Sequence, residues 1–162
     1  ESRPAGMFLF SMKEQTEIVM LEPEKDDTDT EHAIRVAIKQ GAKEITIIGA
    51  IGSRMDHVLG NIALLGIGLE TGVKIQLLDP NNRIRMINKS LTLTKVSQYG
   101  KYISLIPYAG MAKGVTLKGF KYPLEDYTMG GFNALGVSNE ITEDEANIRL
   151  TEGQLVVIES RD

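Results

Sequence analysis

Apolar and polar residues follow two different periods along this chain, and the change comes near its middle. Over Asp29–Gln40, apolar side chains recur at Ala33, Ile34, Ala37 and Ile38, the spacing of a helix with one buried face. A polar residue before the pattern and a glycine after it are typical helix ends. The segment therefore predicts an amphipathic helix.

Two short apolar runs follow and predict strands. Glu44–Gly49 is rich in β-branched residues, which favours a buried strand of a parallel sheet, and Lys74–Leu78 is the next strand. Between them, about Asp56–Thr71 predicts a second helix that ends at Gly72, with its apolar side formed by Val58, Leu59, Ile62, Leu65 and Leu69. Strand, helix and strand with short links predict a right-handed crossover.

After Arg83 the segments become short and alternating, and Gly, Pro, Asn or Asp separates many of them. Such a series of short strands predicts a β-sandwich or barrel. The segments cover residues 83–88, 91–96, 101–107, 114–117, 134–140, 146–150 and 154–159. The predicted fold class is therefore α/β plus all-β, with an α/β domain over residues 1–80 and a β-sandwich over residues 81–162.

The predicted α/β domain contains few strands. An open α/β sheet generally needs more strands than these to cover both faces, and Glu1–Met12 has no clear pattern. We therefore expect a partial Rossmann-like domain, either because an N-terminal portion is absent or because another chain completes the sheet.

Composition narrows the classes of function. The 162 residues are 42% hydrophobic and 25% charged, which is ordinary for a soluble globular protein. The absence of cysteine excludes disulfides and thiolate metal sites and is compatible with the cytoplasm, the expected location. No apolar run has the length of a membrane span, and a net charge of -4 argues against nucleic acid as a partner.

An acidic motif precedes the first predicted helix. Lys25–Glu31 carries four carboxylates at the helix start, where the helix dipole favours negative charge. One interpretation is a well-capped helix in a solvated acidic loop. The other is a Mg²⁺ site, because Mg²⁺ binds carboxylate oxygens and shares its remaining positions with water and phosphate.

A glycine-rich loop follows the first apolar strand. Gly49–His57 lies at the carboxyl end of this strand, where α/β sheets place ligands. Arg54 offers a fork of donors to phosphate, and Asp56 is able to cap the helix, bind metal or accept a substrate hydrogen bond. His57 is able either to donate a hydrogen bond to phosphate or to pack against the loop. No Gly-Lys-Ser/Thr follows the glycines, so the loop is not a P-loop.

Two segments of the β part also carry polar or aromatic groups. Gly136–Glu140 contains Ser138 and Asn139, which suit either a turn or a binding site. Gly119–Leu124 mixes aromatic and basic residues, and core packing or a dimer surface is favoured there over a stacking platform.

In this order and spacing, the motifs resemble the thiamine pyrophosphokinase family from about Leu21 onward. The residues that carry the resemblance are Lys25–Asp29, Gly52–His57 with Asn61, Ser104–Pro107, Gly114–Thr116, Gly119–Leu124 and Gly136–Glu140. The resemblance implies a homodimeric enzyme with active sites at the subunit interface. The implied reaction is attack of the thiamine hydroxyl on the β-phosphorus of Mg-ATP, which yields thiamine diphosphate and AMP.

The resemblance also implies residue roles. Catalysis falls to Asp29, Arg54 and Asp56. The ATP and phosphate site comprises Lys25, Thr28, Gly52, Ser53, Arg54 and His57. Thiamine is bound by Asp29, Ser138 and Asn139, and Mg²⁺ by Asp26, Asp29 and Asp56. These roles suit phosphoryl transfer, which depends on in-line positioning and on neutralising phosphate charge.

The chain departs from the family pattern at two points. Ser53 stands where the family has the second glycine of its Gly-Gly-Arg motif. The family's upstream Asp-Phe-Asp-Ser motif has Phe8–Ser11 as its nearest counterpart, which carries no carboxylate. Two alternatives to the enzyme follow: a non-catalytic thiamine or nucleotide sensor, and an inert fragment without the upstream metal ligands.

Overall fold

The computed structural model describes residues 7–12, 15–20 and 28–162, with side chains from residue 28 onward. The chain divides into two compact units, residues 1–45 and 46–162, and each is described by itself. No helix in the described part of the chain is long and apolar enough to cross a membrane.

The first unit contains a β-hairpin and a helix. Strands β1 (Met7–Met12) and β2 (Gln15–Met20) pair antiparallel, although the opening segment shows no strand pattern in the sequence. Helix α1 (Asp29–Lys39) confirms the first predicted helix and buries Ala33, Ile34 and Ala37. An ion pair of 2.6 Å between Glu31 and Arg35, one turn apart, lies on its surface.

In the second unit, the predicted second helix is two helices. Helix α2 (Met55–Leu64) and helix α3 (Gly66–Thr71) are separated at Leu65, which is buried. Gly72 ends α3 in the left-handed conformation, with φ of 74°. Leu59, expected on the buried side, is 62% exposed. The apolar pattern is therefore divided between α2 and α3 and does not run through one helix.

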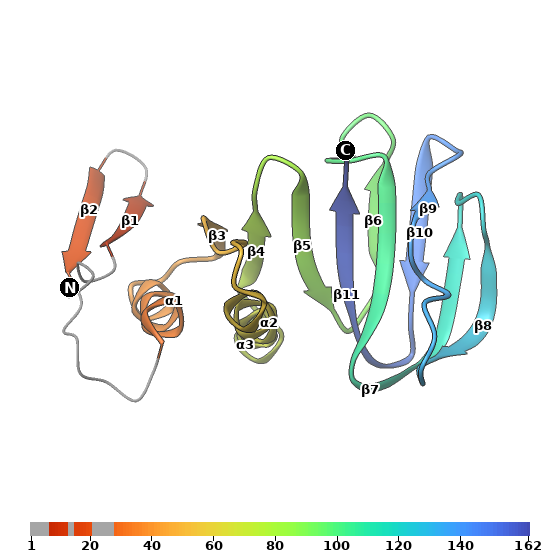
Figure 1. The fold of residues 1–162 in the computed structure, drawn as a ribbon, viewed down its shortest axis with the longest axis horizontal. Coiled ribbons are helices and arrows are strands. Elements are labelled where there is room, and N and C mark those ends of the chain that lie inside the picture. Colours follow the sequence, from red (N-terminus) through yellow and green to blue (C-terminus); the bar gives the residue numbers. More distant parts are fainter. Residues whose placement is uncertain (1–6, 13–14, 21–27) are drawn as a thin grey trace. The chain divides into compact units, whose positions relative to one another are not determined.

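Figure 1 shows that most of the second unit is β-sheet. The strands form one nine-stranded sheet in the order β3-β4-β5-β11-β7-β10-β6, with β8 and β9 paired to β7. Their bounds are β3 (Glu44–Ile48), β4 (Lys74–Leu78), β5 (Asn82–Ile87), β6 (Leu91–Thr94), β7 (Tyr102–Lys118), β8 (Leu124–Met129), β9 (Asn139–Glu140), β10 (Glu145–Arg149) and β11 (Glu152–Ser160). Strands β3 and β4, which α2 and α3 connect, are neighbours in the sheet, as a strand–helix–strand connection predicts.

Strand β7 joins the two halves of this sheet. Its first part pairs with β11 from Tyr102 to Tyr108, and its last part pairs with β10 from Thr116 to Lys118. Ala109 and Gly110, both with positive φ, lie between these parts. One apolar core collects side chains from both parts of β7 and from β6, β10 and β11, so the sheet curls around its own core. The architecture is a mostly β half-barrel.

Several strand expectations need correction. Strand β3 was expected to be buried, but its residues are exposed or half-buried and Ile48 is 78% exposed, because β3 lies at the end of the sheet path. The predicted strands over residues 101–107 and 114–117 are parts of the single strand β7. Of residues 134–140, only Asn139–Glu140 is strand, and β8 was not predicted.

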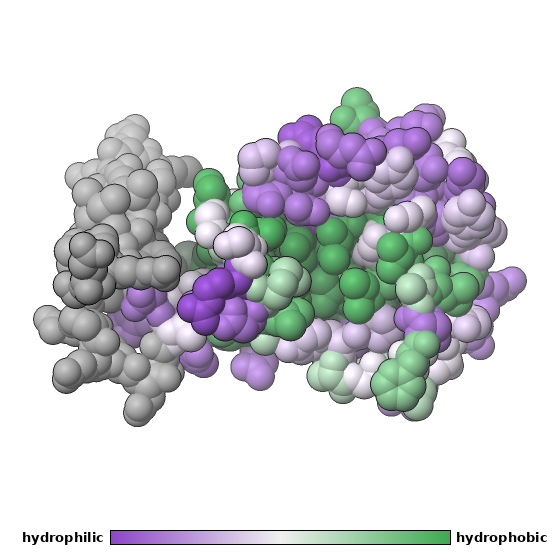
Figure 2. All heavy atoms as spheres, viewed as in Figure 1, coloured by the Kyte–Doolittle hydropathy of each residue, from purple (hydrophilic) through white to green (hydrophobic). Residues whose placement is uncertain are grey.

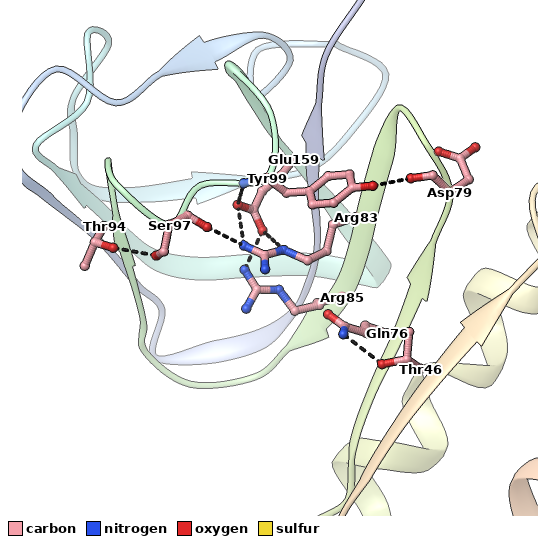
Figure 3. A network of polar contacts seen from close by, with 9 residues as sticks. All are labelled: Thr46, Gln76, Asp79, Arg83, Arg85, Thr94, Ser97, Tyr99 and Glu159. Carbon is pink, nitrogen blue, oxygen red and sulfur yellow. Dashed lines mark hydrogen bonds and ion pairs between the residues drawn. The ribbon is translucent and has the colours of Figure 1, made fainter. Parts of the chain in front are cut away.

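Figure 3 shows a polar network that joins β5, β11 and the segment before β7. The Glu159 side chain is fully buried and accepts hydrogen bonds from Arg83, Arg85 and the Tyr99 N–H. The Tyr99 hydroxyl donates to the Asp79 carbonyl in the β4–β5 turn. The network therefore ties the middle of the chain to its last strand.

Candidate functional site

The start of α1 has the geometry of a capped helix. Thr28 is the N-cap, and its hydroxyl accepts a hydrogen bond of 3.2 Å from the Glu31 N–H. Asp29 follows in the first turn and is exposed. Lys25 and Asp26 lie outside the described residues. Asp29 belongs to the first unit and the glycine-rich loop to the second, so each is described within its own unit.

Arg54 and Asp56 form a forked ion pair at the start of α2. The Arg54 Nε and terminal nitrogen donate to the two Asp56 carboxylate oxygens at 3.2 and 2.5 Å. Both side chains are more than half exposed. The hydrogen bond from Arg54, helped by the His57 backbone N–H, lowers the pKa of Asp56 to about 2. Asp56 is therefore ionised at neutral pH and accessible to a cation.

The loop that carries this pair is open to solvent, and a hydrogen bond from α2 holds it in place. Asn61, in the second turn of α2, donates to the Ala50 carbonyl at 2.9 Å and so ties the loop to the helix. Gly49 has φ of 78°, which favours glycine. A Cβ added to Gly52 would meet no atom within 4 Å, so that backbone has open space beside it. Ser53 and His57 are exposed on the same loop.

The expected Mg²⁺ is compatible with Asp56. Among the residues with described side chains, no three His, Asp or Glu residues gather into a metal-binding group. Mg²⁺, however, is often held by one or two carboxylates, with phosphate and water in the other positions. An exposed, ionised carboxylate next to the guanidinium group of Arg54 fits that donor set.

Ser138 and Asn139 lie side by side but have different surroundings. Asn139 is buried, and its side-chain amide binds the Tyr122 backbone twice: Oδ1 accepts from N–H at 3.0 Å and Nδ2 donates to the carbonyl at 2.8 Å. Ser138 is exposed at a φ of 61°, and its N–H donates to the Ser104 hydroxyl. The Ser138 side chain is thus accessible from solvent, while Asn139 holds the neighbouring segment.

An apolar pocket of about 190 Å³ lies next to this loop, between β7 and residues 129–137. Gly136 forms part of its wall, and its carbonyl accepts a hydrogen bond from the Leu105 N–H at 2.8 Å. A Cβ at Gly136 would lie 2.2 Å from the Leu105 carbonyl, so only glycine permits this close approach. Figure 2 shows apolar side chains gathered across the middle of one face of the second unit.

The structure thus brings together Arg54 with Asp56, and Ser138 with Asn139 and an apolar pocket. The sequence interpretation missed the pocket and the Glu159 network. A charged residue directly after the apolar run Leu155–Ile158, opposite a strand with two arginines, is the sequence signal that could have indicated that network. No comparable signal predicts the pocket, because its walls come from three separate segments.

Two family models match the chain. The model for the thiamin pyrophosphokinase catalytic domain matches residues 7–77, and the model for the thiamin pyrophosphokinase vitamin B1 binding domain matches residues 88–155. The first range includes the Arg54–Asp56 pair, and the second includes Ser138, Asn139 and the pocket.

Curated relatives agree with these matches. The chain is 37% identical over 139 residues to the thiamine pyrophosphokinase of Bacillus subtilis, covering 86% of this chain and 65% of that protein. It is 26% identical to thiamine pyrophosphokinase 1 of Oryza sativa, covering 82% of this chain and 53% of that protein. The chain thus spans about two thirds of the bacterial relative and about half of the rice one.

Solved structures give the same result. The thiamine pyrophosphokinase structure from Bacillus subtilis superposes with a TM-score of 0.81, at 37% identity over 86% of this chain and 65% of that one. The thiamin pyrophosphokinase family protein from Enterococcus faecalis gives a TM-score of 0.77, at 32% identity over 89% of this chain and 68% of that one. Sequence motifs, fold and both domain matches agree, and the chain belongs to the thiamine pyrophosphokinase family.

Proposed function

We propose that this chain is a cytoplasmic enzyme that transfers a diphosphoryl group from Mg-ATP to the hydroxyl of thiamine, giving thiamine diphosphate and AMP. The observation that carries the proposal is the exposed Arg54–Asp56 pair on a glycine-rich loop between a strand and a helix. This pair lies within the match to the catalytic-domain model. Phosphoryl transfer needs a cationic fork and an ionised carboxylate of this kind.

The proposal assigns the parts of the chain to the two substrates. Residues 1–80, predicted as a partial Rossmann-like domain, bind ATP and Mg²⁺, and residues 81–162, whose strands belong to the half-barrel, bind thiamine and dimerise. The positions of the two family matches, on either side of residue 80, support this division.

On the donor side, the fork of Arg54 leaves Asp56 and binds phosphate oxygens. Mg²⁺, when bound, neutralises the phosphate charge, and Asp26, Asp29 and Asp56 are its proposed ligands. The other proposed phosphate-binding residues are Lys25, Thr28, Gly52, Ser53 and His57. Either Asp29 or Asp56, as an ionised carboxylate, orients or deprotonates the thiamine hydroxyl.

On the acceptor side, thiamine occupies the apolar pocket beside Ser138. Ser138 and Asp29 contact the substrate, and Asn139 contributes by holding the loop in place. Ile106, Tyr127 and Val137 line the pocket and are exposed. We propose that a second copy of the chain covers them, so that the active sites lie at the subunit interface of a homodimer.

A chromatographic assay with Mg-ATP and thiamine tests the activity. Thiamine diphosphate and AMP should appear in equal amounts, and Asp29→Asn and Asp56→Asn should abolish both products. Asp144→Asn is the matched control, because Asp144 is an exposed carboxylate far along the sequence from both motifs. Binding of thiamine without any product, from a chain that unfolds cooperatively, would instead support the sensor. Neither binding nor product would indicate an inert fragment.

A further inference from the structure

The segment that carries Ser138 is held against the first part of β7. Strand β9, which begins at Asn139, pairs antiparallel with β7, and Asn139 lies opposite Ile103. On the other side of Ser138, the Gly136 carbonyl accepts a hydrogen bond of 2.8 Å from the Leu105 N–H. The backbone of β7 therefore fixes the segment both before and after Ser138.

Ser138 itself has a backbone conformation unlike that of a strand. Its φ is 61°, in the left-handed region that residues other than glycine seldom adopt. Conformations of this kind persist where the surrounding structure enforces them, and they are concentrated at functional sites. The contacts that hold the Ser138 backbone are therefore of interest for the function of the exposed Ser138 side chain.

The side chain of Ser104 supplies such a contact. Its Oγ accepts a hydrogen bond of 3.0 Å from the Ser138 N–H. A backbone N–H next to the end of a strand needs an acceptor, and here a hydroxyl from β7 takes the place of a backbone carbonyl. Ser104 is 7% exposed, whereas Ser138 is exposed. A ligand that comes from solvent therefore reaches Ser138 and not Ser104.

This contact lies at the edge of the apolar pocket. Leu105, Gly136 and Val137 line the pocket, and Ser104 and Ser138 are their neighbours in the chain. Strand and loop are in close contact here, since a Cβ at Gly136 would lie 2.2 Å from the Leu105 carbonyl oxygen. The position of Ser138 relative to the pocket therefore depends on how the loop is held on β7.

We propose that Ser104 is a positioning residue for thiamine binding, because its hydroxyl holds the Ser138 backbone in the left-handed conformation that presents Ser138 to the substrate. The inference rests on the proposed function, in which Ser138 contacts thiamine. Residues 104–107 form one of the segments that carry the family resemblance, and the inference gives the first of them a task.

A double-mutant cycle of thiamine binding tests the inference. Calorimetric titration of the full chain with thiamine compares the wild type, Ser104→Ala, Ser138→Ala and the double variant. Each single variant should raise the dissociation constant of thiamine about fivefold, the effect of losing one neutral hydrogen bond. The double variant should bind as Ser138→Ala does, because Ser104 acts through a side chain that is no longer there.

Steady-state kinetics adds a readout that a general loss of stability does not give. Ser104→Ala should raise the KM for thiamine and leave kcat and the KM for ATP unchanged. The physical reason is that the Ser138 contact binds thiamine equally in the ground state and the transition state. A fall in kcat at an unchanged KM for thiamine would contradict the positioning role.

Thr116→Val is the matched control on the same strand. Thr116 is 8% exposed, and its hydroxyl accepts a hydrogen bond of 3.1 Å from the N–H of Asp126, which also has a positive φ, of 46°. Asp126 is not one of the proposed substrate contacts. Thr116→Val should therefore reduce stability about as much as Ser104→Ala, while the dissociation constant of thiamine stays at the wild-type value.

The outcomes separate the inference from the proposed function. If Ser138→Ala weakens thiamine binding and Ser104→Ala does not, Ser104 has no positioning role and the proposed function stands. If the two effects add in the double variant, or if Thr116→Val weakens binding equally, Ser104 acts on the fold in general and the inference is wrong. A wild-type chain that neither binds thiamine nor forms product overturns both.

Discussion

Arg83 and Glu159 face each other across neighbouring strands, and the arginine binds both carboxylate oxygens at 2.6 and 2.8 Å. The Glu159 side chain has no solvent exposure. Arg85 and the Tyr99 N–H complete its set of donors, at 2.7 and 3.0 Å. Every oxygen of this buried carboxylate thus has two partners, which is the condition under which a buried charge is tolerated.

Glu159→Gln should destabilise the chain by about 3–5 kcal/mol, because it leaves two partly buried guanidinium groups without their counter-charge. Urea unfolding followed by circular dichroism measures the change. Glu152→Gln is the control: Glu152 pairs with Lys113 on the surface, and its loss should cost less than about 1 kcal/mol. Equal effects of the two variants would show that the Glu159 network does not stabilise the fold.

Acid should weaken the same network. Burial opposes ionisation of Glu159, but the hydrogen bonds from Arg83 and Tyr99 and the two arginine charges outweigh it, so its pKa lies below the usual 4.5. A lowered folded-state pKa contributes stability that is present above the unfolded pKa and is lost as pH falls through the folded value. The free energy of unfolding should therefore decline as pH drops below about 4.5.

A substitution at Arg85 tests whether Glu159 causes the pH dependence of the free energy of unfolding. Arg85→Met removes one donor, so the pKa of Glu159 should rise toward its usual value and the contribution of Glu159 should shrink. The free energy of unfolding, measured at intervals of pH, should then depend less on acid. An unchanged pH profile would exclude Glu159 as a source of the acid sensitivity.

Arg54→Lys should reduce the turnover of the proposed enzyme about 100-fold or more, because lysine lacks the fork that holds phosphate oxygens. The melting temperature should stay within about a degree, since the Arg54 side chain lies largely in solvent and exposed ion pairs contribute little stability. Parallel measurement of product formation and thermal unfolding separates the two effects. A variant that melts early would contradict the assignment of Arg54 to the site alone.

Asn139→Ala should lower the free energy of unfolding by about 1–3 kcal/mol, because it leaves the partly buried N–H and carbonyl of Tyr122 without the buried amide that binds them. Ser138→Ala, at the next position, should leave stability almost unchanged and weaken thiamine binding. Chemical denaturation measures the stability of both variants, and calorimetric titration measures their affinity for thiamine. The opposite assignment, with Ser138 structural and Asn139 on the ligand, would reverse the two results.

The sequence by itself determined the local elements and the candidate chemistry. Helix α1 and strand β4 have the predicted positions because periodicity and end signals are local properties, readable within a dozen residues. The Arg54–Asp56 pair was predictable for the same reason, since two residues of separation already bring the side chains within reach. The family resemblance likewise followed from the order of short motifs.

Only the tertiary structure decided how distant segments meet. Whether β3 is buried depends on which strands flank it, and its place at the end of the sheet path is not written in its own five residues. Asn139 binds Tyr122 from 17 positions away, and Glu159 binds Arg83 from 76 positions away. Such pairings depend on the register of a curled sheet, which the whole set of strands fixes together and no single segment determines.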